Sequence, residues 1–331
     1  MIERDPPPRD PADGPETDLP AGIRYDPDLA VHEPMQVPVG PQTVTRRRSP
    51  LLIFALGTAL LAALVYVLFG LIASEGKSST DYLGEIRMRG GGAWQAAWEL
   101  SRLIPLEDPS RRGPDLAPQI ARLFDEARGS DARLRRYLAL SLKELADPRT
   151  ASTLAAAVRD DPDVETRLYA AWGLGAIGDP AAAATLTALL EDGEPDLRKI
   201  AAHSLGSLGA ESAVDDALAS LMHDPVEDVA WNAALALARH RDPRGLPLLR
   251  RMLDRTYLDG VTRPDPGGRR VPLSEIQKED ALVNALSSVA RLRDPAAAPA
   301  MRRLQGSDPS LRVREAARAA LAALGEPAIR Y

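Results

Sequence analysis

The sequence contains no cysteine, which excludes disulfide bonds, thiolate nucleophiles and cysteine ligands to a metal. Aromatic residues make up only 4% of the 331 residues although hydrophobic residues make up 45%, so alanine and leucine must build most of the core. Such small side chains suit closely stacked helices better than a large mixed sheet. The net charge of −6 is spread evenly along the chain and lacks the basic patch of a nucleic-acid-binding protein, so we expect no nucleic-acid partner.

The chain also lacks the motifs of common catalytic sites. It has no glycine-rich phosphate loop, no nucleophile elbow and no paired catalytic carboxylates. Its four histidines, which show no spacing typical of a metal site, are His32, His203, His223 and His240. We therefore expect a protein that is not an enzyme and that has no catalytic residue, no cofactor and no metal.

One long uncharged hydrophobic run is present, at residues 51–73. As a helix this run would span roughly 34 Å, which is enough to cross a hydrocarbon core of about 30 Å. The run begins too late and is too long for a cleaved signal peptide. We predict a transmembrane helix over residues 51–74, and hence a single-pass protein of the cell (inner) membrane.

Basic residues flank this run unevenly. Three consecutive arginines at residues 46–48 lie directly before it, whereas acidic residues dilute the basic ones that follow. The positive-inside rule then favours a cytoplasmic N-terminus, with the C-terminal domain on the far, periplasmic or extracytoplasmic side. Ala55, Ala59 and Ala63 recur every four residues, a spacing that either favours a homo-oligomer or arises by chance in an alanine-rich chain.

The segments on either side of this run differ in composition. Residues 1–50 hold 11 of the 29 prolines together with many acidic residues, and they show no apolar periodicity. Such a composition cannot offset the entropy lost on ordering, so we predict a disordered tail that is a plain spacer or carries a docking motif. Residues 75–92 include three consecutive glycines and are predicted to form a juxtamembrane linker to a repeat domain at residues 93–331.

Internal repeats dominate residues 93–331. Six segments align on a turn that is usually an acidic residue followed by proline, and successive turns are separated by 32, 31, 32, 52 and 32 residues. The turns are Asp147-Pro148, Asp179-Pro180, Ala210-Glu211, Asp242-Pro243, Asp294-Pro295 and Glu326-Pro327. Small or apolar residues recur nine, five and two residues before each turn, a spacing that places them on one face of a helix. A divergent seventh copy contains Trp94 and Trp98, which we interpret as large side chains of a capping repeat.

A second apolar helix follows each turn, so we interpret each unit as helix, turn and helix. The proline of the turn would stand in the first turn of the second helix, where its missing N–H is not needed. Because the chain reaches Tyr331 soon after the last turn, we expect the final repeat to lack its second helix. Its open end would then present an apolar surface to a partner or a second copy.

Residues 168–180 read LYAAWGLGAIGDP and follow Arg167. This segment resembles the HEAT repeat of the short phycobilisome-lyase type, an armadillo-like repeat with the pattern V-R-x-x-A-A-x-A-L-G-x-I-G-D-P. The resemblance covers residues 93–331. It implies an all-α fold, a right-handed α-solenoid of about seven HEAT-like hairpins whose second helices line the concave side.

In that family an arginine in the Arg167 place commonly braces the adjacent repeat, often against an acidic side chain. The resemblance therefore implies structural struts at four corresponding positions, Arg135, Arg167, Arg198 and Arg314. Ala230 and Leu282 break the pattern, so we expect the strut there to be absent or replaced.

The longest interval between turns contains 20 extra residues, at 255–274. Insertions in solenoids form loops on one face, often the binding face, although a solvated loop without function is the alternative. Ser274 and Gln277 predict a capping box at the start of the following helix. We expect a protein partner to contact the insertion through Arg255, Tyr257, Arg263, Arg269 and Arg270.

Together these features predict a membrane-anchored HEAT-repeat scaffold that binds a protein partner as a subunit of an envelope complex. The alternative is an accessory or regulatory subunit of a membrane transporter or protease. The resemblance also implies a remote alternative, a bilin lyase-like enzyme, which no motif outside the repeats supports.

Overall fold

The computed structural model describes residues 58–62, 64–65, 77–88, 92–264 and 268–325. The chain divides into two units, Met1–Ile72 and Ala73–Tyr331. The helices of the second unit are α2 (Ser79–Met88), α3 (Ala93–Leu103), α4 (Leu116–Glu126), α5 (Ala132–Leu145), α6 (Ala151–Asp160), α7 (Val164–Ile177), α8 (Ala183–Ala188), α9 (Pro195–Leu205), α10 (Ser212–Leu221), α11 (Glu227–Arg239), α12 (Leu246–Met252), α13 (Arg255–Asp259), α14 (Glu275–Arg291), α15 (Ala298–Ser307) and α16 (Leu311–Ala323). Its strands are β1 (Thr262–Pro264) and β2 (Arg270–Pro272).

The structure corrects the prediction of a transmembrane helix before the repeats. In the first unit the described helical residues are 58–62 and 64–65. Among the residues that the structure describes, no helix combines the length and the apolar character needed to cross a membrane. The anchor at 51–74 and the single-pass membrane localisation are corrected accordingly. The other residues of that stretch, and the predicted tail at 1–50, lie outside the described residues.

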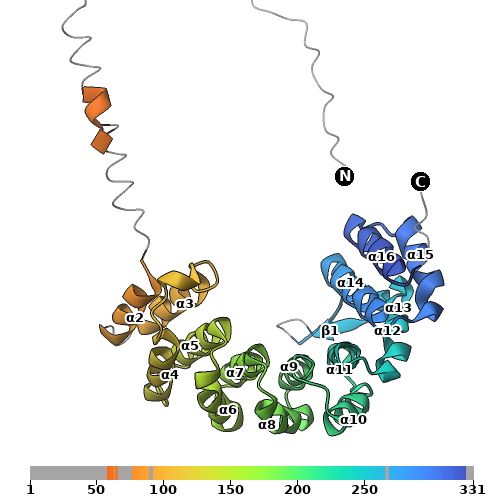
Figure 1. The fold of residues 1–331 in the computed structure, drawn as a ribbon, viewed down its shortest axis with the longest axis horizontal. Helices are drawn as coiled ribbons and strands as arrows, with labels where there is room; N and C mark the ends of the chain where they lie inside the picture. The colour runs from red at the N-terminus through yellow and green to blue at the C-terminus, as the bar shows by residue number, and fades with distance from the viewer. Residues whose placement is uncertain (1–57, 63, 66–76, 89–91, 265–267, 326–331) are drawn as a thin grey trace, which may run out of the picture. The chain divides into compact units, whose positions relative to one another are not determined.

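The second unit is a stack of helical hairpins (Figure 1). Among the described residues the hairpins number seven: α2–α3, α4–α5, α6–α7, α8–α9, α10–α11, α12–α14 and α15–α16. The second helices of the hairpins pack on one another in sequence, from α3 through α5, α7, α9, α11 and α14 to α16, and form one layer. Figure 1 shows α5, α7, α9 and α11 on the concave side of the stack, with α6, α8 and α10 on the convex side. We refer to these layers as the inner and the outer helices.

The acidic-Pro turn joins two hairpins instead of lying within one. At Asp147, Asp179, Asp242 and Asp294 the carboxylate accepts the backbone N–H two residues later, and the following proline starts a short 3-10 helix that leads into the next outer helix. The helix before each turn is therefore the second helix of its hairpin. The repeat boundary predicted from the sequence therefore lies one helix too early, and the last hairpin has both of its helices, α15 and α16.

The buried residues form two clusters that meet in α11. The first runs from Leu83 on α2 to Leu237 on α11. The second runs from Trp231 on α11 to Leu321 on α16. Leucine and alanine fill most of both clusters, as the composition predicted. Leu83 and Ile86 on α2 are buried although they lie in the stretch predicted to be a linker.

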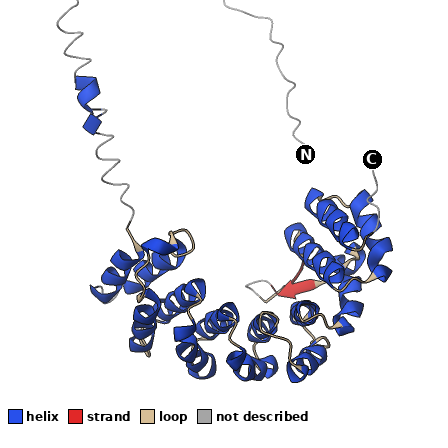
Figure 2. Ribbon diagram, in the orientation of Figure 1, coloured by secondary structure: helices blue, strands red, loops and turns tan. Residues whose placement is uncertain are grey.

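The insertion at 255–274 forms structure of its own between α12 and α14. It contains the short helix α13 and an antiparallel ribbon in which Arg263 of β1 pairs with Val271 of β2. The ribbon (red in Figure 2) is a small departure from the predicted all-α fold. The predicted capping box is confirmed, because the Ser274 hydroxyl accepts the Gln277 N–H while the Gln277 side chain accepts the Ser274 N–H.

Candidate binding surface

Arginine–aspartate pairs connect successive hairpins along the first cluster. In each pair the arginine lies near the start of an inner helix and the aspartate lies just before the next inner helix. Arg135 reaches Asp161 with an Nε–Oδ2 distance of 2.8 Å, and both side chains are buried. The other two pairs are Arg167–Asp192 at 2.5 Å and Arg198–Asp224 at 2.7 Å. These are three of the four arginines that the sequence assigned to struts. The fourth, Arg314, donates to the Asp308 carbonyl of its own hairpin at 2.7 Å.

Where the strut arginine is missing, a residue of the insertion takes over one of the contacts. Leu282 stands in the arginine place of α14, and the aspartate in front of α16 is Asp308, whose side chain is fully buried. Arg255 at the start of α13 binds this carboxylate through two nitrogens, at 2.7 and 2.9 Å. The geometry is bidentate, which is the strong form of the arginine–carboxylate contact.

A second pair runs beside Arg135–Asp161. Arg136 on α5 donates to Asp163 at 2.6 and 2.8 Å, and Asp163 also caps α7 by accepting the Thr166 N–H at 2.9 Å. The hydrogen bonds from Arg136, which outweigh burial, lower the pKa of Asp163 to about 2. Burial acts to raise the pKa of Asp224, but the hydrogen bonds from Arg198 and the Val226 N–H lower it below its usual value. Both carboxylates are therefore ionised at neutral pH.

The few aromatic residues of the repeats gather on the inner helices. Six lie on the inner helices, and the structure places them at corresponding positions, seven, ten or eleven residues before the turn: Trp94, Trp98, Tyr137, Tyr169, Trp172 and Trp231. Positions eleven and seven are one helical turn apart and position ten lies beside them, so the aromatic residues share one face on α3, α5, α7 and α11. We refer to these six residues as the aromatic stripe. All of them except Trp231 are at least partly exposed.

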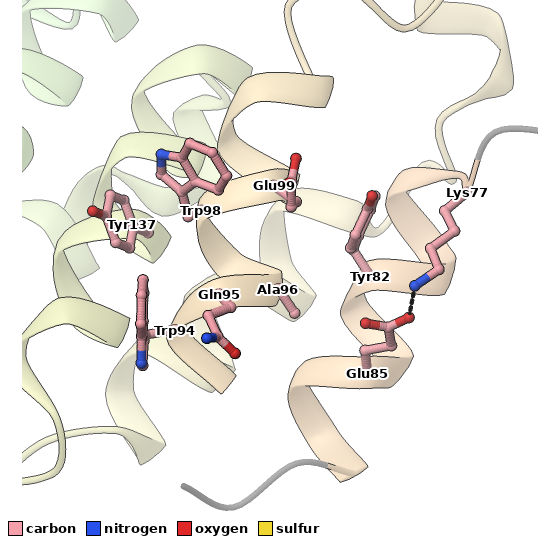
Figure 3. Close-up of a pocket in the computed structure, with 9 residues that line it drawn as sticks. All are labelled: Lys77, Tyr82, Glu85, Trp94, Gln95, Ala96, Trp98, Glu99 and Tyr137. Atoms are coloured by element: carbon pink, nitrogen blue, oxygen red, sulfur yellow. Dashed lines mark hydrogen bonds and ion pairs between the residues drawn. The ribbon is translucent and has the colours of Figure 1, made fainter. Parts of the chain in front are cut away.

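A cavity of about 570 Å³ lies at the start of this stripe, between α2, α3 and α5. Figure 3 shows Trp94 beneath Tyr137, with Trp98 next to them and the paired Lys77 and Glu85 on the opposite side. The rings of Trp94 and Tyr137 stack with their centres 6.4 Å apart. The sequence interpretation of Trp94 as a capping side chain agrees with this packing, although Trp98 is 37% exposed.

Cations cover three of these tryptophans. Arg133 lies 4.5 Å from the centre of Trp94, Arg102 lies 4.8 Å from that of Trp98, and Lys143 lies 4.0 Å from that of Trp172. Partly exposed tryptophan, tyrosine and arginine side chains are the types enriched at the centres of protein interfaces. The sequence contained the signal for this surface, since the aromatic positions share the repeat spacing, but the sequence analysis did not use it.

The residues predicted to bind a partner through the insertion make contacts within the chain. Besides Arg255, Arg263 pairs with Asp228 of α11, and Arg270 donates to the Thr262 hydroxyl at 2.8 Å. Tyr257 accepts the indole N–H of Trp231 at 3.0 Å. The fifth residue, Arg269, also has an interaction partner. Together with the amino ends of α9 and α11 the ribbon lines a cavity of about 420 Å³ whose walls carry both acidic and basic side chains.

Contacts within the repeats account for two of the histidines. His240 is held between the Asp215 carboxylate at 2.6 Å and the Leu205 carbonyl at 3.0 Å. Burial and the neighbouring charges of Arg239 and Lys143 lower the pKa of His203. Within residues 58–325, apart from the gaps given above, no group of three histidine, aspartate or glutamate side chains is arranged to hold a metal ion.

Comparison with known families identifies the repeats. The family model described as HEAT repeats matches residues 120–205 and 183–263. Residues 120–263 thus match HEAT repeats, and they lie within the helical repeat scaffold that the hairpins of the second unit form. No curated protein matches the sequence significantly.

Solved structures with related architecture have low sequence identity. The Escherichia coli protein YibA is 16% identical, with 77% of this chain and 90% of that chain covered and a TM-score of 0.45. A designed armadillo repeat protein in complex with the peptide (KR)4 is 21% identical, with 68% and 99% covered and a TM-score of 0.38. Human deoxyhypusine hydroxylase is 16% identical, with 75% and 98% covered and a TM-score of 0.30.

Proposed function

We propose that this protein is a scaffold that binds a protein partner along the inner helices, on the aromatic stripe that starts at Trp94. The observation that carries the proposal is the placement of six aromatic residues at matching positions of the inner helices in a chain where aromatics make up only 4%. A core filled by leucine and alanine does not need these side chains. All of them except the buried Trp231 are partly exposed on a concave layer, which suits contact with another protein.

The insertion supplies a second contact in this proposal. The ribbon and the amino ends of α9 and α11 line one cavity, so a segment lying along the inner helices would meet Arg263 and Arg270 there. Because Arg263 is already paired with Asp228, its contribution would be smaller than that of the aromatic stripe. Replacing Arg263, Arg269 and Arg270 with serine is expected to weaken binding several-fold without abolishing it.

Site-specific photocrosslinking in cells tests the proposal. A photoreactive phenylalanine analogue is placed at Trp98 or Tyr169 on the inner helices, and at Asp125 or Arg159, which are exposed on the outer helices α4 and α6. We expect a discrete crosslinked product from the inner positions and none from the outer ones. Equal products from both faces, or none from the inner face, would contradict the proposal.

A second substitution checks that the crosslink reports binding. Tyr137→Ser in the protein carrying the probe at Trp98 should remove the product, because serine deletes the ring that stacks on Trp94. Unfolding curves of the same variant show whether the repeats remain folded. Mass spectrometry of the product would identify the partner and would separate a general scaffold from an accessory subunit of a transporter or a protease.

A further inference from the structure

Two neighbouring inner helices end in the same motif. Residues 239–242 at the end of α11 read Arg-His-Arg-Asp, and residues 291–294 at the end of α14 read Arg-Leu-Arg-Asp. The two arginines lie three residues and one residue before the acidic-Pro turn. At the other turns these two places hold Glu144 and Ala146, Ala176 and Gly178, Ser207 and Gly209, and Ala323 and Gly325. The double arginine therefore belongs to the two hairpins on either side of the insertion.

The second arginine of each motif has a backbone conformation that favours glycine. Arg241 has φ of 63° and Arg293 has φ of 51°, both left-handed, and the residue in the same place after α7 is Gly178 with φ of 72°. A side chain is disfavoured in this region because Cβ crowds the backbone, and the usual residues after a helix are glycine and asparagine. Ala146 stands in the same place after α5 with φ of 47°, so a side chain can be accommodated there. What distinguishes Arg241 and Arg293 is the positive charge that they place at the end of the helix.

These arginines have no internal use in the structure. The side chains of Arg241, Arg291 and Arg293 are exposed and make no hydrogen bond or ion pair among the described residues. The aspartates that follow them are already occupied, because Asp242 pairs with Arg244 at 2.6 Å and Asp294 pairs with Arg250 at 2.6 Å. Among the described residues, Arg241, Arg291 and Arg293 therefore have no carboxylate partner of their own.

The three exposed arginines line the same cavity. Arg241, Arg291 and Arg293 line a cavity of about 650 Å³ together with Ser287, Ala290, Leu292 and Ala323. Arg239 is not among the lining residues, but burial and the charge of the lining residue Arg291 lower the pKa of the Arg239 guanidinium. Its Nη1 donates to the His203 carbonyl at 3.2 Å, so this side chain is held beside α9. The cavity therefore combines several guanidinium groups with a hydroxyl and small apolar side chains.

We propose that this cavity binds an acidic segment of a protein partner, with Arg241, Arg291 and Arg293 pairing with its aspartate or glutamate carboxylates. The proposal rests on the proposed scaffold function and names the chemistry of the partner at one end of the inner surface. Guanidinium groups match carboxylates in geometry and charge. Ala290, Leu292 and Ala323 offer contacts to the aliphatic parts of such a segment.

The net charge of the chain favours a short acidic segment over an extended anionic surface. With a net charge of −6, the whole protein repels a nucleic acid or an anionic membrane at long range. A local group of arginines on such a protein favours a ligand whose negative charges are few and close enough together to fit inside the cavity. Neutralisation across a contact of this kind also makes binding sensitive to salt.

Fluorescence anisotropy with the purified full chain tests this site. The probe is a labelled octapeptide of alternating glutamate and leucine, and the control peptide has glutamine in place of glutamate. We expect the acidic peptide to bind at low salt and the control peptide to bind about tenfold more weakly. The double variant R241G/R293G should also lose about tenfold in affinity while its melting temperature stays the same or rises, because glycine suits the left-handed conformation.

A matched variant removes two positive charges elsewhere. Arg149 pairs with Asp147 and Arg318 pairs with Glu315, so R149Q/R318Q changes the net charge equally and should keep peptide affinity within about twofold. Equal binding by wild type and R241G/R293G would overturn the proposal. It would also be overturned if vesicles of phosphatidylglycerol, or inorganic phosphate at millimolar concentration, displaced the peptide and bound in an Arg241-dependent manner more tightly than the peptide does. Crosslinking from Trp98 is independent of these residues, so a failure here would leave the scaffold function standing.

Discussion

The hairpins before α11 and those after it have the same repeat pattern, but different arginine–aspartate pairs connect successive hairpins in the two regions. In the first cluster the inner helices α5, α7 and α9 each carry an arginine that pairs with an aspartate of the next hairpin, from Arg135 to Arg198. In the second cluster Ala230 and Leu282 stand in those places, and the insertion provides Arg255 instead. The two buried clusters meet in α11, at the point where the regular series of pairs stops.

This difference distinguishes the arginines that stabilise the stack from the exposed side chains that are available for binding. The regular pairs stabilise the stack by satisfying buried carboxylates, and they leave the aromatic stripe free on the inner helices. After α11, Arg241, Arg291 and Arg293 lie at the ends of helices with exposed side chains, which is the basis of the proposed acidic-segment site. A solenoid is stabilised by contacts between neighbouring repeats, so the ion pair between two hairpins can differ without altering the packing of the other hairpins.

The largest effect is expected from breaking the most buried pair. Arg135→Ala leaves Asp161 as an unpaired charge, with 1% of its side chain exposed, and should reduce the free energy of unfolding by about 3–5 kcal/mol. Urea unfolding followed by circular dichroism measures the change. Arg133→Ala on the same helix is the control, because its pair with Asp131 is exposed and should contribute at most about 1 kcal/mol. Equal effects of the two changes would show that the buried pair does not brace the stack.

Removing the replacement strut sharpens the comparison. Arg255→Ala leaves the buried Asp308 without its bidentate partner, and we expect a loss of about 2–4 kcal/mol. The loss should be smaller than for Arg135 because the Arg255 side chain is 20% exposed. Hydrogen exchange should show faster opening of α14 to α16 while α5 and α7 keep their protection. An equal loss of hydrogen-exchange protection in both clusters would contradict the view that different ion pairs stabilise the two clusters separately.

Acid should weaken the first cluster through Asp163. Its pKa lies near 2 when folded and near 3.8 when unfolded, so ionised Asp163 stabilises the fold fully above pH 3.8 and loses this effect as the pH falls towards 2. Arg136→Gln removes the main cause of this shift and should lower the free energy of unfolding by about 1–2 kcal/mol at pH 7. Unfolding at a series of pH values should show the difference between variant and wild type shrinking towards pH 2. A difference that stays constant with pH would exclude this pair as its source.

The sequence predicted the helical repeats and the capping box because each rests on local spacing or on a short motif. Alanine and leucine at offsets of four and three define the buried face of a helix whichever hairpin it belongs to. The same spacing does not say whether the acidic-Pro turn lies inside a hairpin or between two, so the repeat boundary was misplaced.

Long-range pairing was harder to predict. The pair between Arg255 and Asp308 joins residues 53 positions apart, and it depends on how α13 packs in space. The spacing of the repeats does not predict the contact between Arg255 and Asp308. The transmembrane prediction failed for a different reason. Hydropathy was its only basis, and among the described residues no helix is long and apolar enough to cross a membrane.

A smaller effect is expected from the closest helix contact of the first cluster. Four residues before the turn, α7 has Gly175 and α9 has Gly206, whereas the same place holds Ala238 on α11 and Ala290 on α14. A Cβ at Gly175 would lie 2.6 Å from the Ser204 side chain and 2.7 Å from its Cα. Gly175→Ala should therefore push α7 and α9 apart and lower the free energy of unfolding by about 1–2 kcal/mol. Gly193→Ala is the control, because its Cβ would meet no atom within 4 Å, and it should leave stability unchanged or raise it slightly. If Gly175→Ala were equally harmless, the close approach of α7 and α9 would not be what distinguishes the first cluster from the second.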